Sequence, residues 1–95
     1  MKGYLVFTRD KMLDKDEMAT YSKEVPATFA GHEFKLLALY GAHEDLEGAA
    51  TEGSVILEFP SVEAAKAWYN SPAYLKVREH RFKGGTYRVT LIEGV

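Results

Sequence analysis

Residues 54–74 constrain the fold more than any other part of this chain, because they join a strand to two successive helices. Within 54–59, Val55, Leu57 and Phe59 alternate with more polar neighbours in the period of two that a strand requires. One face of this strand is therefore apolar, and it must pack against another layer of the protein.

A helix is predicted directly after this strand. Pro60 removes a backbone donor and ends the strand, and Ser61 can accept a hydrogen bond from the first free amides of a helix. Apolar residues then recur at spacings of three and four, which predicts one broad apolar stripe. The residues of this stripe are Val62, Ala64, Ala65, Trp68 and Tyr69.

A second helix is predicted to follow after a short break. Asn70 and Ser71 end the first helix, and Pro72 suits the first position of the next one. Four residues then follow at helical spacing, and the pair Gly84-Gly85 stops the helix. These four are Tyr74, Leu75, Arg78 and Phe82.

The rest of the chain adds a helix and three strands. Apolar and β-branched runs predict strands at 4–8, 34–40 and 87–92. A stripe with helical spacing predicts a helix over about 15–30, with Asp14 as N-cap and Glu17 in the capping-box position. Pro26 should kink this helix and reorient its last turn.

The resulting order, β-α-β-β-α-(α)-β, predicts a ferredoxin-like sandwich of the α+β class. Two right-handed β-α-β crossovers place the helices on one face of a four-stranded antiparallel sheet. No linker, repeat or composition shift divides the chain, so residues 1–95 are predicted to form a single domain.

The other face of this sheet has no cover within the chain. Its expected residues include Ile56 and Ile92 beside Glu58, Arg88 and Thr90. Because an uncovered apolar face is a liability, we predict a homodimer that pairs through this face. The pairing would enclose a cleft between sheet and partner, with polar groups among apolar walls.

Composition excludes several kinds of partner. The formal net charge is −2 with no block of like charges, so we expect no binding to nucleic acid. There are no cysteines, and the three histidines lack metal-ligand spacing, so neither a metal nor a cofactor is predicted. No run is long enough for a signal peptide or a membrane span, which favours a cytoplasmic protein without membrane contact.

Several short motifs are distributed along the chain: Lys2-Gly3-Tyr4, Tyr21, Val25-Pro26, Glu58-Phe59-Pro60-Ser61, Ala64-Ala65, Trp68-Tyr69, Ser71-Pro72, Tyr74, Arg78 and Glu93-Gly94. In these motifs the chain resembles the DUF1330 family of small uncharacterised proteins. The resemblance covers almost the whole chain and implies the dimeric α/β-barrel fold, a ferredoxin-like domain that pairs by its sheets. It implies no established activity.

The chain departs from that family around the second strand. Members usually show a Gly-Gly pair and later an Arg-Gly-Gly, where this chain has Gly31-His32 and residues 39–42, Leu-Tyr-Gly-Ala. The arginine of the family's second strand, and any role as an anion anchor, therefore has no secure counterpart here. Tyr40 is expected to fill that space.

Two residues are candidates for acid-base catalysis. Glu58 lies on a central strand, where burial can raise a carboxyl pKa to a useful value, although a cross-strand ion pair with Arg88 or Arg9 is the alternative. His43 follows the second strand and can border the cleft as a base, whereas a solvated loop histidine is the plainer interpretation.

Four residues are candidates for ligand binding. Tyr40 and Arg88 are expected to orient a ligand in the cleft, and Arg78 can bind a carboxylate with its planar fork. Trp68 is the best aromatic anchor, although aromatic residues with helical spacing more often form the core. A salt bridge across the dimer is the alternative for Arg78, and the run 78–81 suggests an exposed helix face.

Three functions remain open from these residues. The first is a homodimer that binds a small apolar or aromatic metabolite. The second, by analogy with other dimeric α/β-barrel proteins, is a cofactor-independent monooxygenase or isomerase acting on a small aromatic or keto acid. The third is an assembly module with a filled interface and no ligand.

Overall fold

The computed structural model describes residues 1–95 and has the ferredoxin-like α+β architecture that the sequence predicts. Its elements are β1 (Gly3–Met12), α1 (Lys15–Glu24), the 3₁₀ helix η1 (Val25–Phe29), β2 (Lys35–Leu39), β3 (Gly53–Phe59), α2 (Val62–Tyr69), α3 (Pro72–Gly84) and β4 (Gly85–Glu93). Both the order and the type of the expected elements are confirmed.

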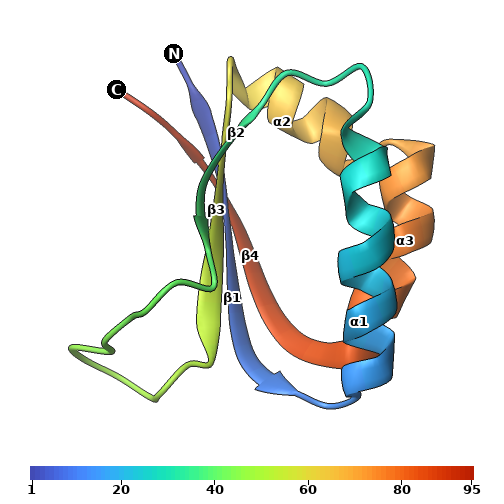
Figure 1. Cartoon of the computed structure of the whole chain (residues 1–95). Helices are drawn as coiled ribbons and strands as arrows, with labels where there is room; N and C mark the ends of the chain where they lie inside the picture. Colours follow the sequence, from blue (N-terminus) through green and yellow to red (C-terminus); the bar gives the residue numbers. More distant parts are fainter.

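The four strands form one antiparallel sheet in the spatial order β2-β3-β1-β4. All helices cover one face of this sheet and leave the other bare (Figure 1). β1 is longer than predicted and continues to Met12, because a register shift between Arg9 and Lys11 lets it stay paired with β4. The predicted two-layer arrangement is confirmed.

α1 begins at the predicted cap. Asp14 Oδ1 accepts hydrogen bonds from the backbone amides of Asp16 and Glu17, at 3.0 and 3.2 Å. The predicted capping box is wrong, because the Glu17 carboxylate bonds to the His80 ring on α3 at 2.6 Å. The backbone amide of Asp14 donates instead to the carbonyl oxygen of Gly84.

The predicted kink at Pro26 is confirmed. α1 ends at Glu24, and the chain continues as the tighter helix η1, in which Pro26 occupies the first turn. Proline cannot donate a backbone hydrogen bond and its ring clashes with the preceding turn, so the regular helix cannot continue. In Figure 1 the chain passes from the end of α1 through these turns and a loop to β2.

Serine side chains cap both later helices. Ser61 Oγ accepts from the amide of Ala64 at 3.0 Å, which confirms the predicted start of α2. Ser71 Oγ accepts from the amide of Tyr74 at 3.3 Å and leads into α3. Pro72 takes the first position of α3, where a missing N–H costs nothing.

The inner face of α3 shares only Tyr74 with the four residues noted for their helical spacing. Its buried residues are Tyr74, Val77, Arg81 and Gly84, whereas Leu75 and Arg78 are half-buried and Phe82 is exposed. The close approach of α3 to α1 sets this orientation, because a Cβ on Gly84 would lie 2.6 Å from Met18 Sδ. Arg81, from the run 78–81 that suggested an exposed helix face, is therefore buried, whereas Phe82 is exposed.

The core between sheet and helices is built around aromatic rings. Trp68 is 1% exposed, and its ring centroid lies 4.1 Å from that of Tyr74 and 4.5 Å from that of Phe29. Its indole Nε1–H donates to Thr28 Oγ1 at 3.0 Å, so the one polar atom of the ring is satisfied. Trp68 thereby ties α2 to both η1 and α3.

The bare face of the sheet has an uncharged central row. Val6 pairs with Ile56 on one side and Thr90 on the other, and Ile56 pairs with Ala38. The loop between β2 and β3 projects on this side, away from the helices (Figure 1), and its Leu46 is 83% exposed. None of the helices is both long and apolar enough to cross a membrane.

Candidate ligand-binding cavity

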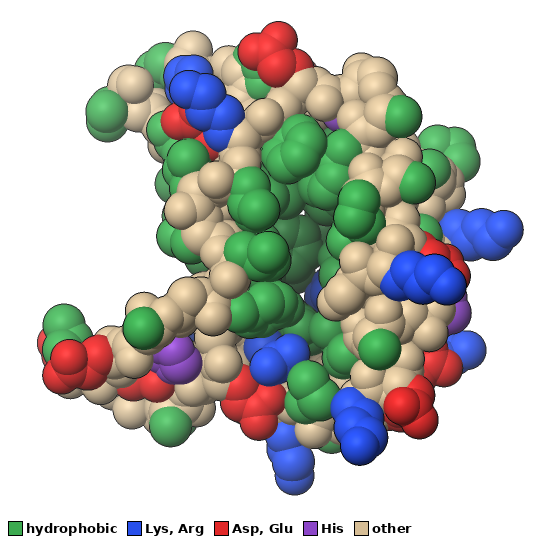
Figure 2. Space-filling view, viewed as in Figure 1, with side chains coloured by type: hydrophobic (Ala, Val, Ile, Leu, Met, Phe, Trp, Pro, Cys, Tyr) green, Lys and Arg blue, Asp and Glu red, His purple; other side chains and the backbone are tan.

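A cavity of about 420 Å³ lies inside the protomer, between the sheet and the helical layer. Figure 2 shows hydrophobic side chains gathered around this hollow. The lining residues are Phe7, Tyr21, Ser22, Val25, Pro26, Phe29, Phe34, Leu36, Leu39, Tyr40, Val55, Leu57, Trp68, Arg81 and Tyr87. The volume is within the range of about 300–1,000 Å³ that is typical of small-molecule sites.

The cavity is not the cleft that the sequence predicts. The predicted cleft lies on the bare face of the sheet, between the protomer and its partner. The cavity lies on the opposite face, with β2 and β3 on one side and α1 and η1 on the other. The short run of β2 explains the opening, because its outer residues Leu36 and Leu39 remain 50% and 58% exposed.

Tyr40 enters the cavity through an unusual backbone conformation. Its φ is +49°, in the left-handed region that costs energy for residues other than glycine. Gly53 makes room for the ring, because a Cβ there would lie 2.8 Å from Tyr40 Cδ1. The Tyr40 hydroxyl lies 2.6 Å from that of Tyr87, so the two hydroxyls share a hydrogen bond beside the cavity.

Arg81 is the one charged side chain in the lining, and it is only 3% exposed. Its guanidinium carbon lies 5.2 Å from the ring centroid of Tyr87 and 5.5 Å from that of Phe7. Nη2 donates to the Tyr69 hydroxyl at 3.3 Å. No carboxylate pairs with Arg81, and its buried Nε–H has no hydrogen-bond partner.

A second tyrosine pair lies close to Arg81. The hydroxyls of Tyr21 and Tyr74 are 2.8 Å apart and connect α1 to α3. Burial is the main reason that the pKa of Tyr21 lies far above its ordinary value, and the neighbouring Tyr74 adds to it. Burial also raises the pKa of Tyr74. Both side chains are therefore neutral hydroxyls at physiological pH.

The raised tyrosine pKa values predict a loss of stability in alkali. The folded state holds the protons of Tyr21 and Tyr74 more tightly than the unfolded chain does, so this contribution is fully present below the unfolded pKa of about 10 and is lost as the pH rises above it. We expect the free energy of unfolding to fall by up to about 1.4 kcal/mol per pH unit for each such group.

Urea denaturation at a series of alkaline pH values measures this slope. Tyr21→Phe removes one of the two groups and should reduce the slope above about pH 10, compared with the unmodified chain. A slope that is the same in both proteins would contradict the assignment. Thr8→Val, a change on the bare face of the sheet, serves as a control that should leave the slope unchanged.

Two of the predicted ligand-binding residues line the cavity. Tyr40 and Trp68 both do so, Tyr40 from the end of β2 and Trp68 from α2. Arg78 does not belong to the lining, and its guanidinium lies over the rings of Tyr69 and Phe82, at 5.3 and 4.9 Å from their centroids. The structure therefore separates Arg78 from the two aromatic residues.

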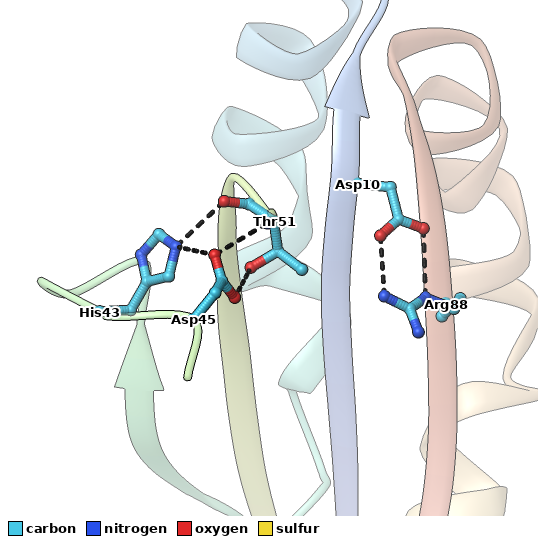
Figure 3. Close-up of polar contacts among 5 residues, drawn as sticks. All are labelled: Asp10, His43, Asp45, Thr51 and Arg88. Atoms are coloured by element: carbon cyan, nitrogen blue, oxygen red, sulfur yellow. Dashed lines mark hydrogen bonds and ion pairs between the residues drawn. The ribbon is translucent and has the colours of Figure 1, made fainter. Parts of the chain in front are cut away.

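Glu58 and Arg88 lie on the bare face of the sheet. Glu58 accepts a hydrogen bond from the Tyr4 hydroxyl at 3.1 Å and forms an ion pair with Lys2 at 3.4 Å. The alternative prediction, an ion pair with Arg88 or Arg9, is therefore wrong. Arg88 instead forms a two-bond pair with Asp10 (Figure 3), at 3.1 and 2.8 Å. The structure does not bring Glu58 or Arg88 together with Tyr40 around one ligand.

His43 lies in the loop between β2 and β3. Figure 3 shows its ring beside Asp45 and Thr51, with Nε2 3.0 Å from the Thr51 carbonyl oxygen and 3.5 Å from Asp45 Oδ2. The Asp45 carboxylate also accepts from the amide and hydroxyl of Thr51. These bonds close the loop, and His43 is not part of the cavity lining.

The cavity contains polar groups that the sequence did not single out for a site. The sequence suggests an exposed helix face for Arg81 and a strand for Tyr87, and for Tyr21 it favours the core over an aromatic pocket. The available signal was the spacing of Tyr74, Val77, Arg81 and Gly84, which repeats after three and four residues. Arg81 is the one charged residue in this stripe, and its position there indicates a buried polar group.

These features define a small ferredoxin-like α+β protein with an internal apolar cavity. The chain matches the model of the family described as "Domain of unknown function (DUF1330)" over residues 2–95 and belongs to that family. The resemblance inferred from the sequence is thereby confirmed. No protein of curated function matches the chain significantly in sequence.

Solved structures support the fold. A protein of unknown function from Rhodopseudomonas palustris is similar with a TM-score of 0.77 and 16% identity, covering 99% of this chain and 82% of its own. A dimeric ferredoxin-like protein of unknown function from Jannaschia has a TM-score of 0.67 and 14% identity, over 99% and 100% of the two chains.

A third similar structure is a cofactor-independent oxygenase from Streptomyces nogalater. Its TM-score is 0.55 at 15% identity, and the match covers 99% of this chain and 91% of that one. At such low identity these neighbours establish the fold and leave the chemistry to the residues of this chain.

Proposed function

We propose that this protein is a homodimer in which each protomer binds a small apolar or aromatic molecule in its internal cavity. The observation that carries the proposal is the cavity itself, which has a ligand-sized volume, a mainly hydrophobic lining and a few convergent polar groups. Trp68, Tyr40 and Phe29 offer aromatic faces to a ring, and the hydroxyls of Tyr40 and Tyr87 can orient a polar substituent.

The bare face of the sheet supports the homodimer. Ile56 and Val6 stand in its central row, and Ile92 is 49% exposed in the next row. A second copy would bury these residues, and the projecting loop with exposed Leu46 would reach across the interface. Ligand binding and dimer formation therefore use opposite faces of the same sheet.

Blocking the mouth of the cavity tests the binding proposal. Leu36 lines the cavity and is 50% exposed, so Leu36→Trp adds bulk at the rim where the fold tolerates it. We expect this change to weaken binding of a neutral fluorescent naphthalene, N-phenyl-1-naphthylamine, by at least about tenfold, because the ring must occupy the same space. Fluorescence titration of the probe measures the effect.

The neighbouring residue offers a matched control. Leu37 belongs to the same strand and is 51% exposed, but it is not part of the cavity lining. Leu37→Trp should leave the affinity for the probe unchanged. Equal effects of the two substitutions, or no saturable binding to the unmodified protein, would count against the cavity as the site.

A cofactor-independent enzyme acting on an aromatic or keto acid is the second candidate. The similarity to an oxygenase favours it, and a cavity that holds an aromatic substrate meets its first requirement. Binding without turnover is better supported, because no carboxylate or imidazole lines the cavity to act as a base. Oxygen consumption with phenolic and keto-acid compounds would reveal such turnover.

The third candidate, an assembly module without a ligand, requires that the open volume stays empty. The cavity opens to the surface, so without a ligand its mainly apolar walls would be left in contact with water. Native mass spectrometry of the freshly purified protein separates this candidate from the first, because it reports subunit number and retained small molecules together.

A further inference from the structure

We infer that the natural ligand carries a single carboxylate on its apolar body, and that Arg81 is the residue that binds this carboxylate. The inference rests on the proposed function, since it names the class of molecule that the cavity takes. The observation behind it is a buried arginine with no acidic partner in the wall of an apolar cavity.

The charge of Arg81 is not neutralised within the protein. A guanidinium stays protonated in proteins, so the side chain is a permanent cation. None of the ion pairs of the chain includes it, although Arg9, Arg88 and Lys2 each pair with a carboxylate at the surface. A buried charge without a partner is destabilising, so its presence beside an open cavity suggests that a bound group completes it.

The hydrogen-bond donors of Arg81 are also incompletely used. A guanidinium has five N–H donors, whereas its polar neighbours are the Tyr69 hydroxyl, which accepts from Nη2 at a long 3.3 Å, and the Tyr74 hydroxyl. Nε–H is buried and without a partner. Nε and one terminal nitrogen form the planar fork that binds the two oxygens of a carboxylate in parallel.

The surroundings of Arg81 favour one compact anion over a phosphate. The rings of Phe7 and Tyr87 flank the guanidinium, and no second cation lines the cavity. A doubly charged phosphate would be left under-neutralised in this apolar wall, whereas one carboxylate balances one guanidinium. The hydroxyls of Tyr40 and Tyr87 also line the cavity and remain for a hydroxyl or carbonyl of the ligand.

Matched acids and amides test the inference directly. The probes are 2-naphthoate and 2-naphthamide, which share a ring system and differ in charge, with cyclohexanecarboxylate and its amide as a second pair. Isothermal titration calorimetry of the intact dimeric protein measures the four affinities. We expect each acid to bind at least about thirtyfold more tightly than its amide, because the amide leaves the buried charge unpaired.

Two variants assign the preference to Arg81. Arg81→Met keeps the length of the side chain without the charge and should abolish the preference for the acid, whereas Arg81→Lys keeps the charge and should retain part of it. Arg78→Met is the matched control from the same helix, because Arg78 is outside the cavity lining, and it should leave the preference unchanged. Circular dichroism confirms that each variant is folded.

The possible outcomes separate this inference from the proposed function. Equal binding of acids and amides, or a preference that survives Arg81→Met, would overturn the role of Arg81 while the cavity remains a binding site. Failure of all four probes to bind at millimolar concentration would overturn the inference, and the independent test with N-phenyl-1-naphthylamine would then decide whether the cavity binds ligands at all.

Discussion

Replacing Trp68 by alanine is expected to destabilise the fold by about 3–5 kcal/mol, a large part of the stability of a domain of this size. The ring is 1% exposed, stacks on Phe29 at 4.5 Å and lies tilted against Tyr74 at 4.1 Å between centroids, so its removal leaves a hole that joins the existing cavity. Urea denaturation followed by far-ultraviolet circular dichroism measures the loss without needing tryptophan fluorescence.

Trp68→Phe separates packing from hydrogen bonding in the same position. Phenylalanine keeps an aromatic ring between η1 and α3 but loses the bond from Nε1 to Thr28. The Thr28 hydroxyl keeps its bond to the Val25 carbonyl oxygen, so no polar group is left unpaired. We expect this variant to lose less than half as much stability as the alanine variant, and equal losses would show that the ring stack is not the stabilising element.

A charge in the centre of the bare face is expected to abolish the homodimer. Thr90 is exposed in the protomer and lies in the central row beside Val6. Thr90→Asp should therefore leave the fold intact but place an unpaired carboxylate in each half of the paired interface. We expect the dissociation constant to rise by more than about a thousandfold, measured by sedimentation equilibrium.

Thr86→Asp provides the control for this substitution. Thr86 is an exposed threonine of the same strand, but it lies beyond the register shift at the start of β4, away from the central row. It should not change the dissociation constant by more than severalfold. A monomeric unmodified protein at micromolar concentration would contradict the homodimer itself.

Most of the fold could be predicted from local signals. Ser61 and Ser71 act as caps, Pro26 breaks its helix, and the alternation in β3 defines its two faces, all through interactions within a few residues. Such signals are readable because the chemistry that produces them is close in sequence. The topology then follows from the limited ways of connecting these elements.

The inner face of α3 could not be predicted in the same way. The sequence contains two overlapping helical stripes, one with Arg78 and Phe82 and one with Val77 and Arg81. The choice between them depends on the contact of Gly84 with Met18, which are 66 positions apart, and not on hydrophobicity along the helix. Hydrophobicity alone placed the arginine outside, so the main polar group of the cavity was missed.

The cavity between the sheet and the helices could not be predicted from local sequence signals either. The alternation of side chains along β1 and β4 reveals a bare apolar face. A space between sheet and helices depends instead on how α1 and η1 are placed relative to β2 and β3, which no short stretch of sequence determines. Tyr40 and Trp68 are predicted for a cleft between sheet and partner, and within the protomer both line the cavity on the other face. Glu58 and Arg88 lie on the bare face of the sheet, where the sequence predicts them, and not in this cavity.

A titration with 2-naphthoate, followed through the side-chain Nε–H signals of the arginines by nuclear magnetic resonance, tests the central claim most directly. The chain has four arginines, Arg9, Arg78, Arg81 and Arg88. We predict a large shift of the Arg81 signal and none for Arg88, because the ligand enters the cavity inside the protomer. A shift of Arg88 with an unchanged Arg81 would place the ligand on the bare face of the sheet and contradict this account.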